Sequence, residues 1–598
     1  MKVLFLINDA FGIGGTIKTT MNLGAALAAR GHDVEVLSTL RRKDVPQMPV
    51  DPAIRLMSLI ETRPAHPDYD RAATGRGKPP RLYPKSDFKS MDYDQFVEDR
   101  YREYLRGTDA DVVIATRPGL ITYLAKFAPR GVVKIGQEHL IRGQHRKALR
   151  ELMPRYLRKL DAFVTVSERD AEDYRQHLRL RRTRLLHIPN SIPAPTVAPS
   201  HGRAKLVVAA GRLVPSKRYD VLVRAFAKVI AERPDWQLRI YGDGKEVPAL
   251  RALILELGLH NHVRMMGGYT PIEPEWAKGS IAAVSADREP FGMTLVEAMR
   301  CGVPVVSTDA PHGPGEILAD GVDGLLTPVG DPDALGDALL RVINDDELRR
   351  SMATAALANS ARYDPAPIGA RYEELFEELR RGTRRWRRPR PMTVLGPAPS
   401  VSRPLIDWDG VSPLPEGTRW DKEPIGEGTY QLLAADGEPV QAGARDTRAL
   451  LDGPVGTRVQ LPFRRPDGGL GMRVWDRPVY AEVDTVDADA EGVHLTGRLY
   501  GAHFDEPLVR AVAGEQSHEF PVHTEGTQFR TTLTGLPAGD WALWLRHAAT
   551  GDPVRLGRFR DDIVGKRTAF VLPTAQIDGV TLQPEFTTGN EFSIRATN

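Results

Sequence analysis

The feature that most restricts the fold of this chain is a series of short, largely apolar runs, each followed by a stretch with helical periodicity. In the first third, such runs lie at residues 3–7, 34–37, 111–116, 132–136 and 162–167. Short continuous apolar runs are typical of strands that are buried on both faces. A glycine-rich turn, FGIGGT, follows the first run, and a helix is expected from near Ile17 to Gly31. Strands that alternate with helices in this way favour a parallel, doubly wound sheet.

The same pattern begins again after a connector rich in proline and serine that ends at Ser200. Its expected helices are residues 219–232 and 246–257. Its expected strands are residues 205–212, 263–268, 280–286 and 303–308, and residues 237–244 are expected to form a strand and its turn. We therefore predict an N-terminal Rossmann-like domain, residues 1–196, and a second one, residues 197–364, with residues 365–380 packing back on the first. In such folds ligands bind at the carboxyl ends of the strands, so the two units should face each other across a cleft.

The rest of the chain has a different character. Residues 62–89 read as a long loop within the first unit, and seven arginines with one tryptophan mark residues 380–390. We expect residues 381–403 to form a basic, proline-rich linker. From residue 404 to residue 598, short alternating segments separated by Gly, Asp and Pro replace the helical pattern. They predict an accessory all-β region, a sandwich or barrel of one or two modules, through which the chain could also form oligomers.

Composition excludes several classes of protein. The 81 basic residues nearly balance the 78 acidic ones, and the net charge of +3 gives no support to nucleic-acid binding. The single cysteine, Cys301, allows no disulfide within the chain and is expected to be a small packed residue at the end of a helix. The N-terminus lacks the pattern of a signal peptide, and no run of about 18 apolar residues occurs. We expect a cytoplasmic protein, with peripheral binding to the inner membrane face as an open question.

The strongest chemical signal is the segment DREPFGMTLVEAMRCGVPVVSTD, residues 287–309, which carries two glutamates around a glycine. A loop that leads into a helix offers free N–H groups and a partial positive charge, and both suit a phosphate. A glutamate before the helix can accept hydrogen bonds from a sugar, and one in its early turns can accept them from a ribose. The residues concerned are Glu289, Gly292, Met293, Thr294, Leu295 and Glu297.

A second signal is the pair Arg212 and Lys217, which directly follows a predicted strand. Two fixed cations can stabilise the negative charge that develops on a departing nucleoside diphosphate. Together with the helix N-terminus they could replace a divalent metal. We therefore expect no metal and no cofactor, because the nucleotide-sugar would be a co-substrate.

These motifs resemble the retaining glycosyltransferases of family 4, which have the GT-B fold. The resemblance covers roughly residues 1–380, and the motifs that carry it are GRLVPSK, EPFGMTLVE, HGPGEILADGVDGLL, VSERDAEDY, HIPNSI and the glycine loop with its helix, residues 8–36. It implies a hexosyltransferase-type enzyme that moves a sugar from a nucleotide-sugar, with UDP favoured, to a hydroxyl acceptor.

The resemblance also implies roles for individual residues. Arg212 and Lys217 would hold the diphosphate with backbone N–H groups near Gly14, Gly15 and the helix start at 292–295. Glu297 would bind the ribose, and Glu289 would contact the donor sugar and stabilise positive charge at its anomeric carbon. His139 would face the donor sugar and the acceptor, with His145 a weaker candidate in the same loop.

Three further features leave alternatives open. An expected helix over residues 146–160, with a kink expected at Pro154, has a basic face, which suits either solvent or an anionic membrane surface. The closing residues 580–598 loosely resemble the ends of β modules on bacterial cell-wall polymer enzymes, which suggests a teichoic-acid-like or lipid-linked glycan as the acceptor. The competing functions are a glycosidase or phosphorylase that uses two carboxylates, and a non-catalytic carbohydrate-binding scaffold.

Overall fold

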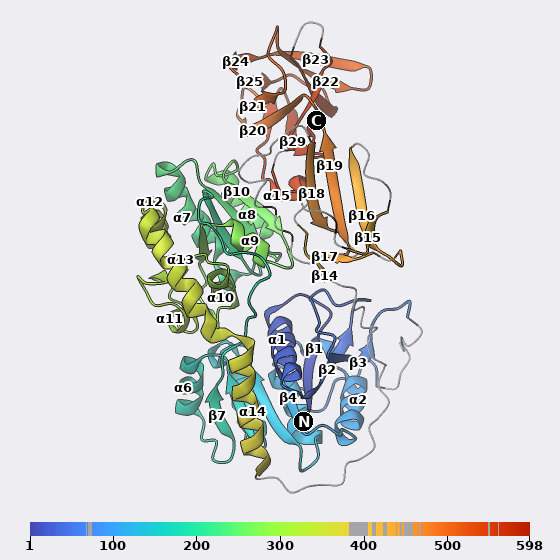
Figure 1. The fold of residues 1–598 in the computed structure, drawn as a ribbon, viewed down its shortest axis with the longest axis vertical. Helices are drawn as coiled ribbons and strands as arrows, with labels where there is room; N and C mark the ends of the chain where they lie inside the picture. The colour runs from blue at the N-terminus through green and yellow to red at the C-terminus, as the bar shows by residue number, and fades with distance from the viewer. Residues whose placement is uncertain are drawn as a thin grey trace.

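The structure is a computed structural model of the whole chain. It describes residues 1–598 except for residues 67–68, 70–74, 382–404, 409–413, 415, 422–426, 438, 443–444, 446, 448–457, 466–467, 548–550 and 560. The expected linker and most of its arginine run therefore lie outside the described residues. Two α/β domains and a β region follow one another along the chain, coloured from blue to red in Figure 1.

The first domain is built on a seven-stranded sheet in the order β3-β2-β1-β4-β5-β6-β7, and every neighbouring pair of strands is parallel. All five predicted strands are present, and β3 and β7 are added to them. The strands are β1 (Lys2–Asp9), β2 (Asp33–Arg41), β3 (Ile54–Glu61), β4 (Val112–Ala115), β5 (Val133–Glu138), β6 (Ala162–Thr165) and β7 (Arg184–His187). The central strand β1 is buried along its whole interior because helices cover both faces.

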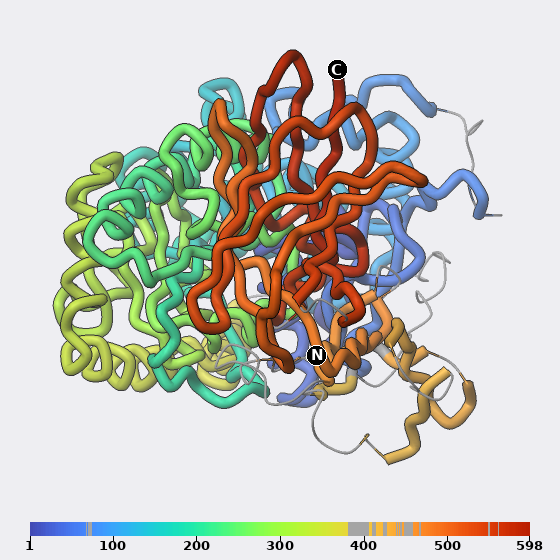
Figure 2. The backbone as a smooth tube through the Cα atoms, turned by 90° about the horizontal axis from the view of Figure 1, so that it is seen from above, coloured from blue at the N-terminus to red at the C-terminus, as the bar shows by residue number. Residues whose placement is uncertain are grey.

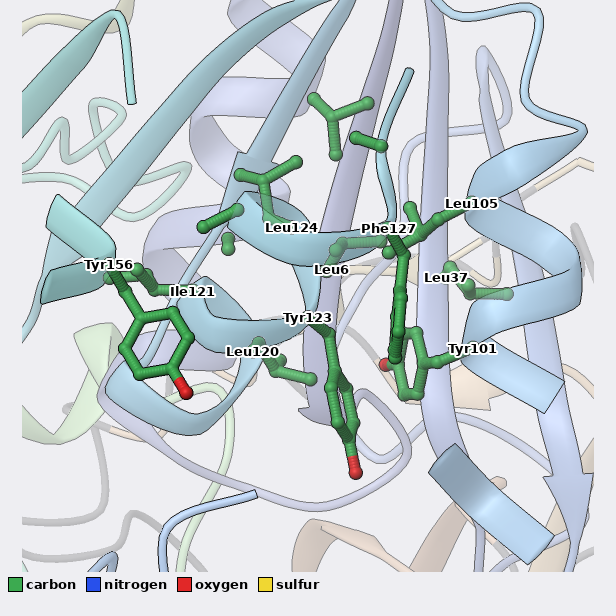
Figure 3. Close-up of a cluster of buried hydrophobic side chains, with 14 of the residues drawn as sticks. Leu6, Leu37, Tyr101, Leu105, Leu120, Ile121, Tyr123, Leu124, Phe127 and Tyr156 are labelled. Atoms are coloured by element: carbon green, nitrogen blue, oxygen red, sulfur yellow. The ribbon is translucent and has the colours of Figure 1, made fainter. Parts of the chain in front are cut away.

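One face of this sheet is covered by α2 (Gln95–Arg106) and α3 (Pro118–Phe127), and their aromatic rings fill the space between them (Figure 3). The rings of Tyr123 and Phe127 stack with centroids 5.5 Å apart. The predicted loop, residues 62–89, has no helix or strand among its described residues. Its second half is nevertheless anchored, because Tyr83 is buried and stacks on Tyr93 with ring centroids 3.7 Å apart.

The other face carries α1 (Gly15–Ala29) and α14 (Pro365–Arg381). Helix α14 comes from the far end of the second domain and lies along the first, as Figure 1 shows in yellow. Its residues Tyr372 and Phe376 are buried in the same core as Phe5 and Ile7 of β1. The chain therefore crosses between the two α/β domains twice.

The second domain repeats this plan with six parallel strands in the order β10-β9-β8-β11-β12-β13. The predicted helix over residues 219–232 is confirmed as α7 (Tyr219–Glu232). The strands are β8 (Leu206–Ala210), β9 (Gln237–Tyr241), β10 (Val263–Gly267), β11 (Ile281–Val284), β12 (Val305–Thr308) and β13 (Gly324–Thr327). The other main helices are α8 (Val247–Glu256), α9 (Glu273–Lys278), α10 (Met293–Arg300), α12 (Pro332–Asn344) and α13 (Asp346–Ser360). Two Rossmann-like domains are thus confirmed.

The expected helix over residues 146–160 is interrupted at Pro154, the position at which a kink is expected. The segment forms two short helices, α4 (Lys147–Leu152) and α5 (Pro154–Leu157), because a proline cannot continue the hydrogen-bond ladder of the preceding turn. Its apolar side chains Leu149, Tyr156 and Leu157 are buried in the first core. The amphipathic pattern is therefore explained by packing inside the domain.

The β region contains two groups of strands, which Figure 2 shows from above in orange and red. The first group has a four-stranded sheet, β15 (Thr418–Trp420), β16 (Gly428–Ala434), β19 (Leu470–Asp476) and β18 (Arg458–Arg464), and a parallel pair, β14 (Leu405–Ile406) and β17 (Gln441–Ala442). The second group is a larger, mainly antiparallel assembly made of β20 (Tyr480–Ala488), β21 (Val493–Tyr500), β22 (Leu508–Ala513), β23 (Gln516–Pro521), β24 (His523–Glu525), β25 (Gln528–Leu533), β26 (Gly539–Arg546), β27 (Val554–Gly557), β28 (Ala575–Ile577), β29 (Val580–Phe586) and β30 (Phe592–Thr597). The prediction of a separate β region is confirmed, with one short helix, α15 (Lys566–Ala569), in addition.

The β region docks on the edge of the second α/β domain. The buried carboxylate of Asp562 lies 2.8 Å from a guanidinium nitrogen of Arg239 and 2.5 Å from Nζ of Lys278. Arg264 lies over the ring of Phe570 at 4.1 Å, and Val571 joins the core of the α/β domain. Helix α15 packs against the edge strand β10. Among the described residues, no helix is both long and apolar enough to cross a membrane.

Candidate functional site

Each α/β sheet has one point at which the strand order reverses, between β1 and β4 in the first domain and between β8 and β11 in the second. Loops diverge at such a point and leave a crevice at the carboxyl ends of the strands, where ligands bind in doubly wound folds. The segments that leave these strands carry most of the predicted site residues. Gly14 and Gly15 follow β1, Arg212 and Lys217 follow β8, and Glu289 follows β11.

Lys217 and Glu289 form an ion pair across the switch point of the second domain, between Nζ and Oε2. Two hydrogen bonds fix the loops that carry them: the Ser285 hydroxyl donates to the Lys217 carbonyl at 3.0 Å, and the Asp287 N–H donates to the Ser216 carbonyl at 3.0 Å. The structure thus brings together two residues that are 72 positions apart. Glu289 is buried, so its carboxylate depends on this cation for compensation.

Arg212 lies on the same loop with its side chain exposed to solvent. Its neighbour Leu213 donates a backbone hydrogen bond to Asp243 at 2.9 Å, which ties the loop to the end of β9. Among the described residues, no carboxylate or carbonyl pairs with the Arg212 guanidinium. The cation is therefore available to a ligand above the switch point.

Helix α10 begins at this point, with Gly292 as its N-cap at φ 112°. A side chain is strained in this left-handed region, and a Cβ at Gly292 would lie 3.0 Å from a methyl group of Leu295, so only glycine fits well. The Leu295 N–H donates to the Gly292 carbonyl at 3.0 Å and is already used. In the described part of the chain, the N–H groups of Met293 and Thr294 have no acceptor, and they point to where an anion would bind.

Glu297 is held by a residue of the first domain that sequence reasoning does not single out. Nζ of Lys18, in the first turn of α1, lies 2.6 Å from Oε1 of Glu297 and 2.7 Å from Oε1 of Glu273 at the start of α9. This contact joins the carboxyl ends of the two sheets. Lys18 is the single charged residue of α1 and directly follows the glycine loop, which is the signal that could have identified it.

The electrostatics of this trio follow from burial and proximity. Burial opposes the charge of Lys18, but the two carboxylates outweigh it and raise its pKa. Burial likewise works against ionised Glu273, yet Lys18 holds its pKa below the usual range. Burial and the nearby Glu273 raise the pKa of Glu297 despite Lys18. One largely buried cation is thus shared by two carboxylates.

The glycine loop has room for a ligand. A Cβ atom at Gly14 or Gly15 would meet no atom within 4 Å. Gly14 is the N-cap of α1, and its carbonyl accepts a hydrogen bond from the Lys18 N–H at 3.0 Å. Open space in front of a helix start is what an anionic group requires.

His139 and His145 have different environments. Burial lowers the pKa of His139 to about 4, so its ring is neutral near pH 7, and Nε2 lies 3.3 Å from Oε1 of Gln137. His145 is bonded to the buried Glu138, with 2.7 Å between Nε2 and Oε2. Burial opposes the charge of His145, but the carboxylate raises its pKa. His145 is thus committed to a structural ion pair, which leaves His139 as the candidate for contact with a substrate.

The motif HGPGEILADGVDGLL of the second domain meets the motif VSERDAEDY of the first domain at a second contact between the α/β domains. The carboxylate of Glu316 accepts hydrogen bonds from the N–H groups of Glu168 and Arg169, at 2.8 and 2.9 Å. These are the first residues of α6 (Glu168–His177) in the first domain. A carboxylate at a helix N-terminus stabilises the free amides there.

Cys301, as expected, is buried at the end of α10.

Family models match both α/β domains. Residues 13–194 match the model described as Glycosyltransferase Family 4, and residues 196–358 match Glycosyl transferases group 1. The α/β domains belong to glycosyltransferase family 4.

Curated relatives share part of their length with this chain. An exopolysaccharide phosphotransferase of Streptomyces coelicolor is 36% identical over 392 residues, which cover 63% of this chain and 41% of that protein. A phosphatidyl-myo-inositol mannosyltransferase of Mycolicibacterium smegmatis is 26% identical over 395 residues, which cover 63% of this chain and 94% of that protein. The chain spans about two fifths of the length of the first curated relatives that it matches.

Solved structures agree in fold. The Staphylococcus aureus TarM G117R mutant, solved with fondaparinux, alpha-GlcNAc-glycerol and UDP, superposes with a TM-score of 0.53 at 15% identity, over 63% of this chain and all of that one. Sucrose-phosphate synthase of Thermosynechococcus elongatus gives a TM-score of 0.51 at 19% identity, over 63% of this chain and 99% of that one. These likenesses show the GT-B fold.

Proposed function

We propose that the chain is a retaining glycosyltransferase that moves a sugar from a nucleotide-sugar, with a UDP-sugar favoured, to a hydroxyl group of a glycopolymer or lipid-linked glycan. The observation that carries this proposal is the pairing of Lys217 with Glu289 beside the start of α10. At this switch point the cation and the free helix amides suit the diphosphate of a nucleotide-sugar, and the carboxylate suits its sugar.

The cations would bind the leaving group. Arg212 has no competing partner among the described residues, and Lys217 lies at the same loop, so both can approach a diphosphate together with the amides of Met293 and Thr294. As the bond to the sugar breaks, negative charge builds on the diphosphate, and fixed donors stabilise it without reorganising. In this proposal these groups take the place of a divalent metal.

The carboxylates would bind sugar hydroxyls and the ribose. Glu289 would face the donor sugar. A phosphate of the donor would attract Lys217 and weaken its ion pair with Glu289, so that the Glu289 carboxylate could bind a sugar hydroxyl instead. Oε1 of Glu297 is bonded to Lys18, so the ribose would use Oε2. Lys18 would thereby couple nucleotide binding to the closed arrangement of the two domains.

His139 would hold a hydroxyl of the donor sugar. Its lowered pKa keeps the ring neutral near pH 7, so one ring nitrogen can accept a hydrogen bond and the other can donate one. The proton of the incoming hydroxyl would pass to a phosphate oxygen of the leaving group, which requires no protein nucleophile. Attack from the side of the leaving group gives retention.

The donor and acceptor classes are supported by what similar proteins bind or act on. TarM was solved with UDP and alpha-GlcNAc-glycerol, and the relative from Streptomyces is an exopolysaccharide enzyme. Because that relative is a phosphotransferase, it also suggests a different reaction, the transfer of a phosphosugar. Transfer of a sugar breaks the bond at the anomeric carbon and releases UDP, whereas transfer of a phosphosugar breaks the diphosphate and releases UMP.

The test is to incubate the purified full-length chain with UDP-, GDP- and ADP-sugars and an acceptor glycan, and to identify the nucleotide that is released. We expect a nucleoside diphosphate and a product with the anomeric configuration of the donor. Glu289→Gln and Lys217→Ala should each lower the rate by about 10²- to 10³-fold, as the loss of a fixed charge-stabilising group does elsewhere.

Lys228→Ala is a matched control, since Lys228 is a surface lysine of α7 that pairs with Asp337. Its rate should stay at the wild-type level. Release of a nucleoside monophosphate would replace the proposal with phosphosugar transfer. Full activity of Glu289→Gln would refute the site, and release of free sugar from a glycan without nucleotide would favour the glycosidase alternative.

A further inference from the structure

A buried carboxylate precedes His139 in the sequence and holds the loop that carries it. Glu138, the last residue of β5, is 3% exposed, whereas His139 is only partly buried. Oε1 of Glu138 accepts a hydrogen bond from the Leu140 N–H at 3.0 Å. The Glu138 side chain therefore closes a turn around His139, and a change in the His139 backbone would have to break this hydrogen bond.

Two further donors fix the other oxygen of the same carboxylate. Oε2 of Glu138 lies 2.7 Å from Nε2 of His145, and the Tyr174 hydroxyl donates to it at 2.8 Å. All three side chains are buried. Burial opposes the charge of Glu138, but His145 and the hydrogen bonds outweigh it and lower the pKa of Glu138 to about 2. Near pH 7 the carboxylate is therefore ionised and accepts from all three donors.

Helix α6 carries two of the partners of this loop. Tyr174 lies on α6, and Asp170, one turn before it, accepts a hydrogen bond from the Arg142 N–H at 2.8 Å. The first amides of the same helix are bonded to Glu316 of the second domain. The loop that carries His139 is thus fixed at two points to an element that also contacts the second domain.

A second buried residue holds the ring of His139. Nε2 of His139 lies 3.3 Å from Oε1 of Gln137, and Nε2 of Gln137 donates to the Tyr372 hydroxyl of α14 at 2.7 Å. In this orientation of the amide, His139 donates through Nε2 and keeps Nδ1 as an acceptor. Gln137 therefore orients the ring, while Glu138 fixes the backbone that carries it.

We propose that Glu138 is a positioning residue for His139, which sets the place of the His139 ring at the donor sugar without touching the substrate. A buried ion pair is a weak source of stability because desolvation offsets the attraction of its charges. Fixing one conformation of the loop is the effect that this geometry supports. A small misplacement of a group at the reacting sugar can lower the rate by about 10²-fold. This role for Glu138 rests on the proposed function, in which His139 contacts the donor sugar.

The experiment is a double-mutant cycle on the full-length chain, with Glu138→Gln, His139→Ala and the double variant. We expect Glu138→Gln to lower kcat by about 10- to 50-fold, while the affinity for UDP stays within about twofold of wild type. In the His139→Ala background the same change should lower kcat by less than about twofold, because the group that Glu138 positions is gone. A merely structural role would give the same factor in both backgrounds.

Glu172→Gln is the matched control, since Glu172 is an exposed residue of α6 that pairs with Arg175. Its kcat should equal that of the wild type. If Glu138→Gln does not fold, as judged from its melting temperature, Tyr174→Phe takes its place in the cycle. It removes one donor to the carboxylate and should lower kcat by about three- to tenfold.

Two results would overturn the positioning role. One is equal loss of kcat in the wild-type and His139→Ala backgrounds, and the other is wild-type kcat in His139→Ala itself. Both are distinguishable from failure of the proposed function, which the nucleotide released by the wild type tests.

Discussion

The second α/β domain has two neighbours, and its two interfaces are built differently. Towards the first domain, at the carboxyl ends of the sheets, the contact is Lys18 with Glu273 and Glu297, and the side chains of Lys18 and Glu273 stay 17% and 20% exposed. Towards the β region, Asp562, Arg239 and Lys278 are each at most 4% exposed and are surrounded by apolar packing.

This difference indicates at which of the two interfaces a ligand can replace a protein group in an ion pair. An ion pair that water partly reaches costs less to open than a fully buried one, and a ligand phosphate or ribose can take over its hydrogen bonds. A fully buried pair cannot be opened without leaving charges in an apolar interior. The first interface is therefore suited to a working site, and the second to a permanent attachment of the β region.

The largest effect should come from breaking the permanent interface. Asp562→Ala leaves Arg239 without its carboxylate and leaves Lys278 with Glu275 alone. We expect the free energy of unfolding to fall by about 3–5 kcal/mol, because an uncompensated charge stays buried. Urea denaturation followed by tryptophan fluorescence measures the change.

The same interface offers a matched control. Asp487 is 54% exposed and lies 2.8 Å from Nε2 of His260. Asp487→Ala should change the stability by less than about 1 kcal/mol, as exposed pairs do. If both variants lost the same stability, burial would not be what distinguishes the two interfaces.

A smaller effect should follow from breaking the contact between the α/β domains. Lys18→Gln leaves two carboxylates facing each other, and we expect a loss of about 1.5–3 kcal/mol for the charged hydrogen bonds in the closed arrangement. The radius of gyration from small-angle X-ray scattering should increase, while Lys18→Arg should keep the wild-type value. An unchanged radius in Lys18→Gln would show that other contacts hold the domains together.

The smallest effect is a loss of stability at low pH. Burial opposes the charge of Asp562, but Arg239 and Lys278 outweigh it and hold its pKa below the usual range. A lowered pKa contributes stability that is present above the unfolded value, about 3.9, and is lost as the pH falls below it. The contribution of Asp562 should change by less than about 0.1 kcal/mol between pH 7 and 5, and by about 1 kcal/mol by pH 3. The free energy of unfolding of the wild type and of Asp562→Asn, measured at each pH, gives this contribution. A loss of the contribution already at pH 6 would contradict the prediction.

Much of the fold can be predicted because local patterns encode it. Most strands of the two sheets follow from apolar runs, since a strand buried on both faces needs such a run wherever it lies. The helix over residues 219–232 is predicted with its observed bounds. The helix expected over residues 146–160 divides in two at Pro154, the position at which a kink is expected, because proline ends the hydrogen-bond ladder. Strand β3 is not predicted, although its residues 56–60 form a largely apolar run.

The candidate site can be predicted only in part. Arg212, Lys217, Glu289 and Glu297 lie in short motifs that follow predicted strands, and their roles remain predictions. Lys18 is marked in the sequence as the single charged residue of α1, but its two partners cannot be predicted because they are 255 and 279 residues away.

The sequence by itself determined the two Rossmann-like domains, the separate β region and the loops that carry the candidate site, because apolar periodicity and glycine positions act over a few residues. The tertiary structure alone decided which of these loops meet, how the β region attaches, and which charges are buried together. The physical reason is that charges interact through space, so the environment of Lys18 or Asp562 is set by chain segments hundreds of residues away, which only the folded domains bring close.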